Sequence, residues 1–162
     1  MIKVAIKEAN LLTSKCMWNS VFELVILHSF GIHGAFSDTL GISSSEFAEL
    51  MAVIRAIDLA WQKGWHSLWL ECDSSLVLSY LDLAEPNIPW QLWTQWNNSM
   101  SFLRQMNFRC SHIFREGNIP ADKLANRGVA SSSFTWWDSV PAFIAPDVAY
   151  ECNGLPYYRF RS

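Results

Sequence analysis

Three acidic residues, Glu49, Asp73 and Asp122, are spaced along the chain so that a suitable fold could bring their carboxylates to one point. Magnesium prefers hard oxygen ligands of this kind and usually combines one or two carboxylates with phosphate oxygens of a substrate. Two metal ions held ~3.5–4 Å apart can stabilise both the attacking and the leaving oxygen of a displacement at phosphorus. The three acids therefore predict metal-dependent chemistry at a phosphate, provided that the fold gathers them.

Each acid also has a purely structural interpretation. Glu49 could be a buried glutamate paired with a lysine or arginine, or a first-turn acid that favours the helix dipole. Asp73 begins the run Asp-Ser-Ser, which is good helix-capping chemistry. Asp122 follows a proline by two positions, and an acid in the first turn of a helix stabilises its dipole. Taken one at a time, the acids leave both interpretations open.

The clearest element is a helix predicted over residues 46–63, which contain no glycine or proline and precede Gly64. At ~100° per residue, Glu49 falls on the apolar face of this helix, ringed by small side chains. The opposite face, expected to be solvated, comprises Arg55, Asp58 and Gln62. The pattern thus predicts a carboxylate on the buried side of the helix.

The remaining elements come from runs of β-branched and apolar residues and from the glycines and prolines between them. Strands are predicted at 2–6, 21–28, 67–72 and 107–114, with a hairpin return at 33–37. Further helices are predicted at 75–84 and 90–105, with a short one begun by Pro120. This order predicts an α/β domain with a mixed sheet. Asp73 directly follows the strand at 67–72, and open α/β sheets place their sites at such strand ends.

Composition limits the class of protein. The chain has 162 residues, of which 51% are hydrophobic, which suits one globular domain with one core. Its net charge is −3 and it has no Lys/Arg run, which counts against tight electrostatic binding of nucleic acid. An acidic metal site fits better, because bound cations would supply the missing positive charge.

The cysteines and the hydrophobic pattern indicate the cellular compartment of the protein. The four cysteines show neither zinc nor redox spacing, and charged residues interrupt the first twenty positions, so no secretory signal is expected. We therefore expect free cysteines in a reducing, intracellular setting, without distinguishing nucleus from cytoplasm. No apolar run of ~18 residues is present, so no membrane association is expected.

Three segments carry a family resemblance. Residues 45–50 (SEFAEL), 70–74 (LECDS) and 112–125 (HIFREGNIPADKLA) occur in this order. Together they resemble the ribonuclease H-like family, in the plant branch related to the ribonuclease H domains of non-LTR retrotransposon reverse transcriptases. The resemblance covers about residues 30–130, and more weakly the Trp136-Trp137 pair.

The resemblance implies an α/β fold of the ribonuclease H-like type, a five-stranded mixed sheet flanked by helices. It implies hydrolysis of the RNA strand of RNA–DNA hybrids with Mg²⁺ or Mn²⁺, where Glu49, Asp73 and Asp122 match the family's catalytic, metal-binding acids. Nucleic-acid contacts are implied at Ser44, Ser45, Ser75 and Asn118, for which capping and loop roles stay open. The domain is expected at 1–130, with residues 1–29 atypical, followed by an aromatic-rich tail at 131–162.

The sequence departs from the family at the first strand, where a further aspartate is expected. The best placement sets Lys7 at this position, which would remove one negative charge and add a positive one. The histidine that many bacterial relatives carry before the last aspartate is also absent. Two alternatives therefore stand beside an active enzyme: an inactive module that binds nucleic acid, and an interaction domain that uses the tryptophans of 90–96 and 136–137 as a protein surface.

Overall fold

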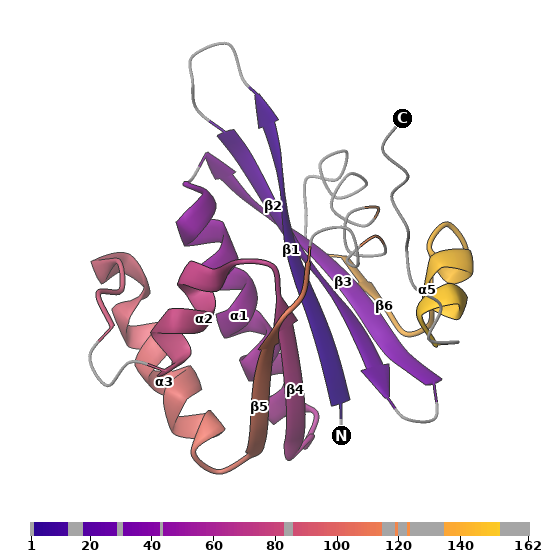
Figure 1. Cartoon of the computed structure of the whole chain (residues 1–162). Coiled ribbons are helices and arrows are strands. Elements are labelled where there is room, and N and C mark those ends of the chain that lie inside the picture. Colours follow the sequence, from indigo (N-terminus) through magenta and orange to yellow (C-terminus); the bar gives the residue numbers. More distant parts are fainter. Residues whose placement is uncertain are drawn as a thin grey trace.

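The computed structural model describes residues 2–12, 18–28, 31–42, 44–82, 86–114, 119, 123 and 135–152, with side chains for only part of these. Figure 1 shows a sheet with helices packed beside it. The strands are β1 (Ile2–Leu12), β2 (Trp18–His28), β3 (Gly31–Ile42), β4 (Ser67–Cys72), β5 (Asn107–His112) and β6 (Thr135–Trp137). The helices are α1 (Ser45–Gln62), α2 (Ser75–Asp82), the 3₁₀ turn η1 (Trp90–Leu92), α3 (Trp93–Leu103) and α5 (Ala145–Cys152).

The sheet is mixed, as expected from the sequence. Its strand order is β5-β4-β1-β2-β3-β6. β1, β2 and β3 form an antiparallel meander, while β4 runs parallel to β1 and β5 runs parallel to β4. In the β1–β4 pair, Ile2 lies opposite Leu68 and Ile6 lies opposite Cys72. The end of β4 therefore lies beside the middle of the longer strand β1.

The expected number of five strands is not what the structure has, because β6 adds a sixth strand along the outer edge of β3. Trp136 is paired with Phe36, and Trp137 with Ala35. A three-residue strand is too short to leave a period in the sequence, so no strand was predicted in the tail. The division into a domain at 1–130 and a tail stays a prediction.

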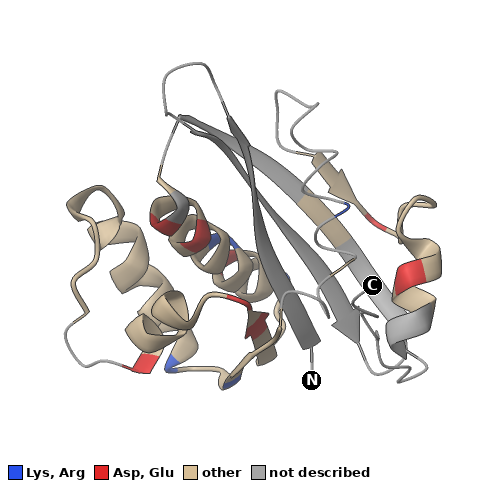
Figure 2. Ribbon diagram, turned by 45° about the horizontal axis from the view of Figure 1, so that its top comes forward, with Lys and Arg blue, Asp and Glu red and all other residues tan. Residues whose placement is uncertain are grey.

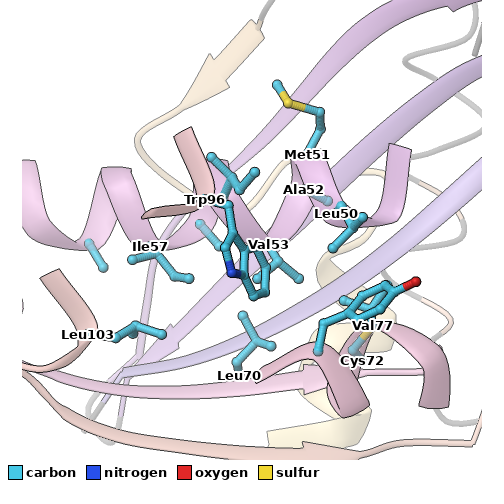
Figure 3. Close-up of a cluster of buried hydrophobic side chains, with 14 of the residues drawn as sticks. Leu50, Met51, Ala52, Val53, Ile57, Leu70, Cys72, Val77, Trp96 and Leu103 are labelled. Carbon is cyan, nitrogen blue, oxygen red and sulfur yellow. The ribbon is translucent and has the colours of Figure 1, made fainter. Parts of the chain in front are cut away.

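Two apolar clusters cover opposite faces of the sheet. Adjacent residues of a strand point to opposite faces, and in β3 Phe36 belongs to the larger cluster and Ala35 to the smaller. The larger cluster joins α1, α2 and α3 to the sheet, and Figure 3 shows Trp96 of α3 among side chains of α1 and β4. The smaller cluster holds α5 to the sheet through Ile144 and Val148, which are 0% and 3% exposed.

Helix α1 occupies the predicted position almost residue for residue. Gly64 adopts a left-handed φ of 69°, and Trp65 donates its backbone N–H to the Ala60 carbonyl at 2.8 Å, which closes the helix as expected. Arg55 and Gln62 are exposed, as predicted. Asp58, predicted on the solvated face, is instead half-buried and accepts a hydrogen bond from Ser99 of α3 at 2.8 Å. The prediction failed because α3 packs across this face, which the helical period alone cannot show.

The Ser99–Asp58 bond links α1 to α3 and should depend on pH. Burial raises the pKa of Asp58 above 3.8, while the Ser99 bond and the nearby Arg55 charge oppose the rise. The charge-assisted bond is present while Asp58 is ionised and weakens as pH falls through the raised pKa. We expect Ser99→Ala to lower the free energy of unfolding at pH 7 by about 1–2 kcal/mol in urea titrations, and by less once the pH falls below the raised pKa of Asp58.

Ser101→Ala is the matched control, because Ser101 is on the same helix and bonds only locally, to the Asn98 carbonyl at 2.7 Å. An equal loss in the two variants at every pH would show that the bond to Asp58 contributes nothing of its own.

Within the described part of the chain, no helix is long and apolar enough to cross a membrane. The intracellular location stays a prediction.

Candidate metal centre

Glu49 lies on the second turn of α1, near the sheet end that bears Cys72. The start of the helix is fixed by Ser44, whose side-chain oxygen accepts the backbone N–H of Phe47 at 3.2 Å. The neighbours of Glu49 in sequence, Ala48 and Leu50, are fully buried. Glu49 itself is partly exposed rather than fully buried, so its carboxylate borders both the core and solvent. This position is accessible to a cation.

Asp73 follows the last residue of β4 and precedes α2. Ser74 caps this helix: its side-chain oxygen accepts the backbone N–H of Val77 at 3.4 Å, and its carbonyl accepts that of Leu78 at 3.2 Å. The capping interpretation of Asp73 stays open beside the metal-binding one. It is partly exposed at the end of a buried strand.

Two observations bring Glu49 and Asp73 to the same region. The hydroxyl of Tyr80 on α2 donates to Oε1 of Glu46 at 2.6 Å, which ties α2 to the first turn of α1 and raises the Tyr80 pKa. The fully buried thiol of Cys72 has its pKa raised to about 12, chiefly by burial, and the charges of Asp73 and Glu49 both add to the rise. The charges of both carboxylates thus shift the pKa of one thiol in the same direction, as the lesser causes beside burial. Figure 2 marks the acidic residues of α1 and of the end of β4 in red.

The backbone register places Lys7 near the chain segment that bears Asp73. Ile6 and Cys72 form the last pair of the parallel strands β1 and β4. Lys7 and Asp73 each follow directly, so the backbone of Lys7 adjoins the segment that bears Asp73. The match of Lys7 to the family's first-strand acid stays a prediction. The side chain of Lys7 lies outside those that the structure describes.

The other predicted site residues are described unevenly. Asp122 and Asn118 lie outside the described residues, as does the side chain of Ser45. Ser44 and Ser75 are exposed near the starts of α1 and α2. Ser44 caps α1, which is one of the two roles that the sequence left open for it. Its side chain is nevertheless exposed.

Among the described residues, no group of three or more His, Cys, Asp and Glu side chains could hold a metal ion. Asp122 lies outside the described residues, so Glu49 and Asp73 are the predicted metal ligands that the structure describes. The donor chemistry suits a hard cation, because both groups are carboxylates and the neighbouring thiol, with its raised pKa, stays protonated at neutral pH. A soft metal such as zinc would require a thiolate or imidazole set that this pair does not offer.

The tryptophans expected on a protein surface divide into two kinds. Trp90 and Trp93 are 82% and 50% exposed, and Trp93 lines a hollow of about 690 Å³ between α2, α3 and β5. Trp96 is only 2% exposed and belongs to the core, which corrects its assignment to a surface. In the tail, Trp136 lies under the ammonium of Lys63, 4.2 Å from the ring centroid, and Trp137 packs near α5. The tail pair therefore contributes to the fold.

One ion pair was not predicted from the sequence. Nζ of Lys123 is 2.7 Å from Oδ2 of Asp147, at the start of α5. The two residues are 24 positions apart, so no local pattern could reveal the pair. It joins the residue after Asp122 to the C-terminal helix.

Comparisons with known proteins show which family and which fold this chain resembles. A family model described as reverse transcriptase-like matches residues 18–128. A protein of Arabidopsis thaliana that carries the name of a ribonuclease H is 30% identical over 118 residues, a match that covers 67% of this chain. The same match covers 18% of the relative, so the chain spans less than a fifth of the length of that protein.

Solved structures show the likeness of fold. The ribonuclease H1 of the archaeon Halobacterium salinarum matches with a TM-score of 0.67 and 23% identity, over 81% of this chain and 98% of the other. LC11 ribonuclease H1, isolated from compost and solved in complex with an RNA/DNA hybrid, matches with a TM-score of 0.64 and 19% identity, over 78% of this chain and 95% of the other. At these identities the likeness concerns the mixed α/β fold.

Proposed function

The chain belongs to the reverse transcriptase-like family, whose fold is that of ribonuclease H, and we propose that it binds nucleic acid and hydrolyses the RNA strand of RNA–DNA hybrids. The observation that supports this proposal most directly is that the charges of Glu49, on α1, and of Asp73, after β4, both raise the pKa of the Cys72 thiol. A hybrid substrate is supported by the relative that was solved with one. A retrotransposon-derived, plant origin fits the sequence resemblance and the Arabidopsis match.

We propose Mg²⁺ or Mn²⁺ as the cofactor, held by Glu49, Asp73 and Asp122. When bound, such cations stabilise negative charge at the scissile phosphate and activate water. The protein's own contribution is to hold the carboxylates in place before substrate arrives. Glu49 is held by a helix with its core face packed on the sheet, and Asp73 by the end of a strand paired on both sides. Rigid elements of this kind suit a site that depends on precise distances.

The nucleic-acid backbone would pass the starts of α1 and α2. Ser44 and Ser75 are exposed there, and hydroxyl groups and the N-termini of helices are common donors to phosphate oxygens. We propose that Ser45 and Asn118 contribute to the same contact. Because the chain has few cations and a net charge of −3, its affinity for a hybrid should rise when divalent metal is added.

A specific observation keeps a second function open. The backbone of Lys7 adjoins that of Asp73, and the family match begins only at residue 18, after Lys7. A centre with a lysine in place of the first aspartate would hold two dications poorly. The alternative is therefore a ribonuclease H-fold module that binds hybrids or a protein partner without cleaving RNA.

One assay separates the two functions. The protein is incubated with a hybrid labelled on the RNA strand, in Mg²⁺, in Mn²⁺ and in EDTA, and both cleavage and binding are recorded. The proposed activity predicts RNA fragments with either metal and none in EDTA. Retention of the hybrid without fragments would support the inactive binding module. If the folded protein neither binds nor cleaves the hybrid, both nucleic-acid functions fail.

A further inference from the structure

A hydrogen bond between side chains joins the first turn of α1 to α2. The hydroxyl of Tyr80 donates to Oε1 of Glu46 at 2.6 Å, across 34 positions of the chain. Glu46 is three residues before Glu49, so the two acids are neighbours on the surface of α1. Tyr80 is in α2, which begins two residues after Asp73. The bond therefore connects the helix that bears one predicted metal ligand to the helix that follows the other.

The donor of this bond is held in place by the core. The side chain of Tyr80 is 9% exposed and belongs to the larger apolar cluster, where close packing restricts it to one conformation. The acceptor Glu46 is partly exposed, on a helix whose start is capped by Ser44. A hydroxyl that donates to a carboxylate makes a charge-assisted bond, roughly twice as strong as a neutral one. The bond can therefore fix the first turn of α1 against α2.

The other contacts of α1 do not supply this constraint. Ala48 and Leu50 are fully buried, but apolar burial has no direction, whereas a hydrogen bond has a preferred length and angle. The bond from Ser99 to Asp58 orients the same helix against α3, but Asp58 is ~13.5 Å further along the axis than Glu49. The Tyr80–Glu46 bond thus acts at the end of the helix that bears Glu49.

We propose that the Tyr80–Glu46 hydrogen bond positions Glu49 relative to Asp73 for metal binding. This inference rests on the proposed function, since it concerns two ligands of the same centre. Tyr80 and Glu46 are positioning residues: neither is a proposed ligand, and Glu46 does not form a metal-holding group with Glu49 and Asp73. A displacement of ~1 Å is costly for a site that depends on precise distances, so the loss of this bond should be measurable there.

The test is Mn²⁺ binding to the full chain, measured by calorimetry, with thermal unfolding of each variant recorded beside it. Tyr80→Phe removes the hydroxyl but keeps the ring and the charge of Glu46. It is expected to weaken Mn²⁺ binding about threefold to tenfold, less than the roughly 10–100-fold typical of groups bonded directly to a metal ligand. In a Glu46→Ala background, Tyr80→Phe should have no further effect, because the bond is already absent. Glu46→Gln keeps an acceptor oxygen and should weaken binding less than Tyr80→Phe does.

Two variants serve as controls. Ser99→Ala also breaks a hydrogen bond to an acid of α1, but further along the helix, so it is matched for loss of stability. Ser79→Ala removes a hydroxyl from α2 that bonds locally, to the Leu76 carbonyl at 2.6 Å. Both should leave the affinity for Mn²⁺ unchanged. Equal weakening in Ser99→Ala would overturn the inference, because a general loss of stability would then explain the effect.

The remaining outcomes are distinct. Wild-type binding that Tyr80→Phe leaves unchanged would overturn the positioning role and leave the proposed metal centre intact. Greater weakening in Glu46→Gln than in Tyr80→Phe would also overturn it, because the charge of Glu46 rather than its bond would then control affinity. If the wild-type protein binds no Mn²⁺, the proposed function fails, and the positioning role fails with it.

Discussion

Asp73→Asn is expected to lower the rate of metal-dependent RNA cleavage by about 100-fold or more. The substitution keeps the shape of the side chain and removes the charge that a divalent cation requires. Changes to groups that merely support a metal ligand already cost 10–100-fold, so the loss of a ligand should cost at least as much. Ser74 caps α2, and asparagine is about as good a capping residue as aspartate, so the helix should form normally in the variant. Single-turnover cleavage of a labelled hybrid measures the effect, and the urea midpoint confirms folding.

Asp82→Asn is the control for this variant. Asp82 is exposed at the end of α2, so its substitution removes the same charge from the helix that follows Asp73 but at the end away from the centre. It should leave cleavage within about twofold of the wild-type rate. Equal loss in both variants would mean that overall charge, rather than a ligand at position 73, controls the rate. Undiminished cleavage by Asp73→Asn would remove this residue from the centre.

The parts of the fold that sequence predicted are those governed by local chemistry. Gly64 ends α1 because only glycine readily adopts the φ of 69° found there. Ser44 begins the same helix with a side-chain cap, so both helix ends could be predicted from the sequence. The strand at 67–72 was found with its exact bounds because an apolar run between glycine and a polar turn has few other solutions. The first three strands were placed but predicted too short.

Contacts between elements that are distant in the chain could not be predicted from the sequence. Asp58 was assigned to solvent, yet Ser99 reaches it from α3, 41 positions away. Trp96 was assigned to a surface, yet it fills the space between α3, α1 and β4. No helix or strand was predicted in the tail, yet β6 and α5 lie within it. In each case the outcome depends on which surface another element covers, and the local period carries no such information.

For the candidate site, the sequence identified residue types that could bind a metal ion. A glutamate on a helix and an aspartate after a strand have ordinary structural explanations when taken alone. The structure adds that the charges of Glu49 and Asp73 both raise the pKa of the Cys72 thiol, for which burial is the main cause. Asp122 lies outside the described residues and stays a predicted ligand.

Lys7→Asp is expected to raise the rate of hybrid cleavage about 100-fold, or to create cleavage if the wild-type protein only binds. The backbone of residue 7 adjoins that of Asp73, where an added carboxylate could complete the set of acids. Reversing a unit charge near a dication changes the interaction by several kcal/mol at an effective dielectric constant of ~20, and each 1.36 kcal/mol is a tenfold change in rate. The gain should require Asp73, so the Lys7→Asp/Asp73→Asn double variant should lose it.

The matched control for this gain is Lys3→Asp, which makes the same charge change on the same strand. Lys3 is paired with Trp69, four residues before Asp73, a separation of ~13 Å along a strand. It should leave cleavage unchanged, whereas a general effect of lower net positive charge would appear in both variants. If Lys7→Asp folds and cleaves no faster than the wild-type protein, a missing first-strand acid is not what limits this centre.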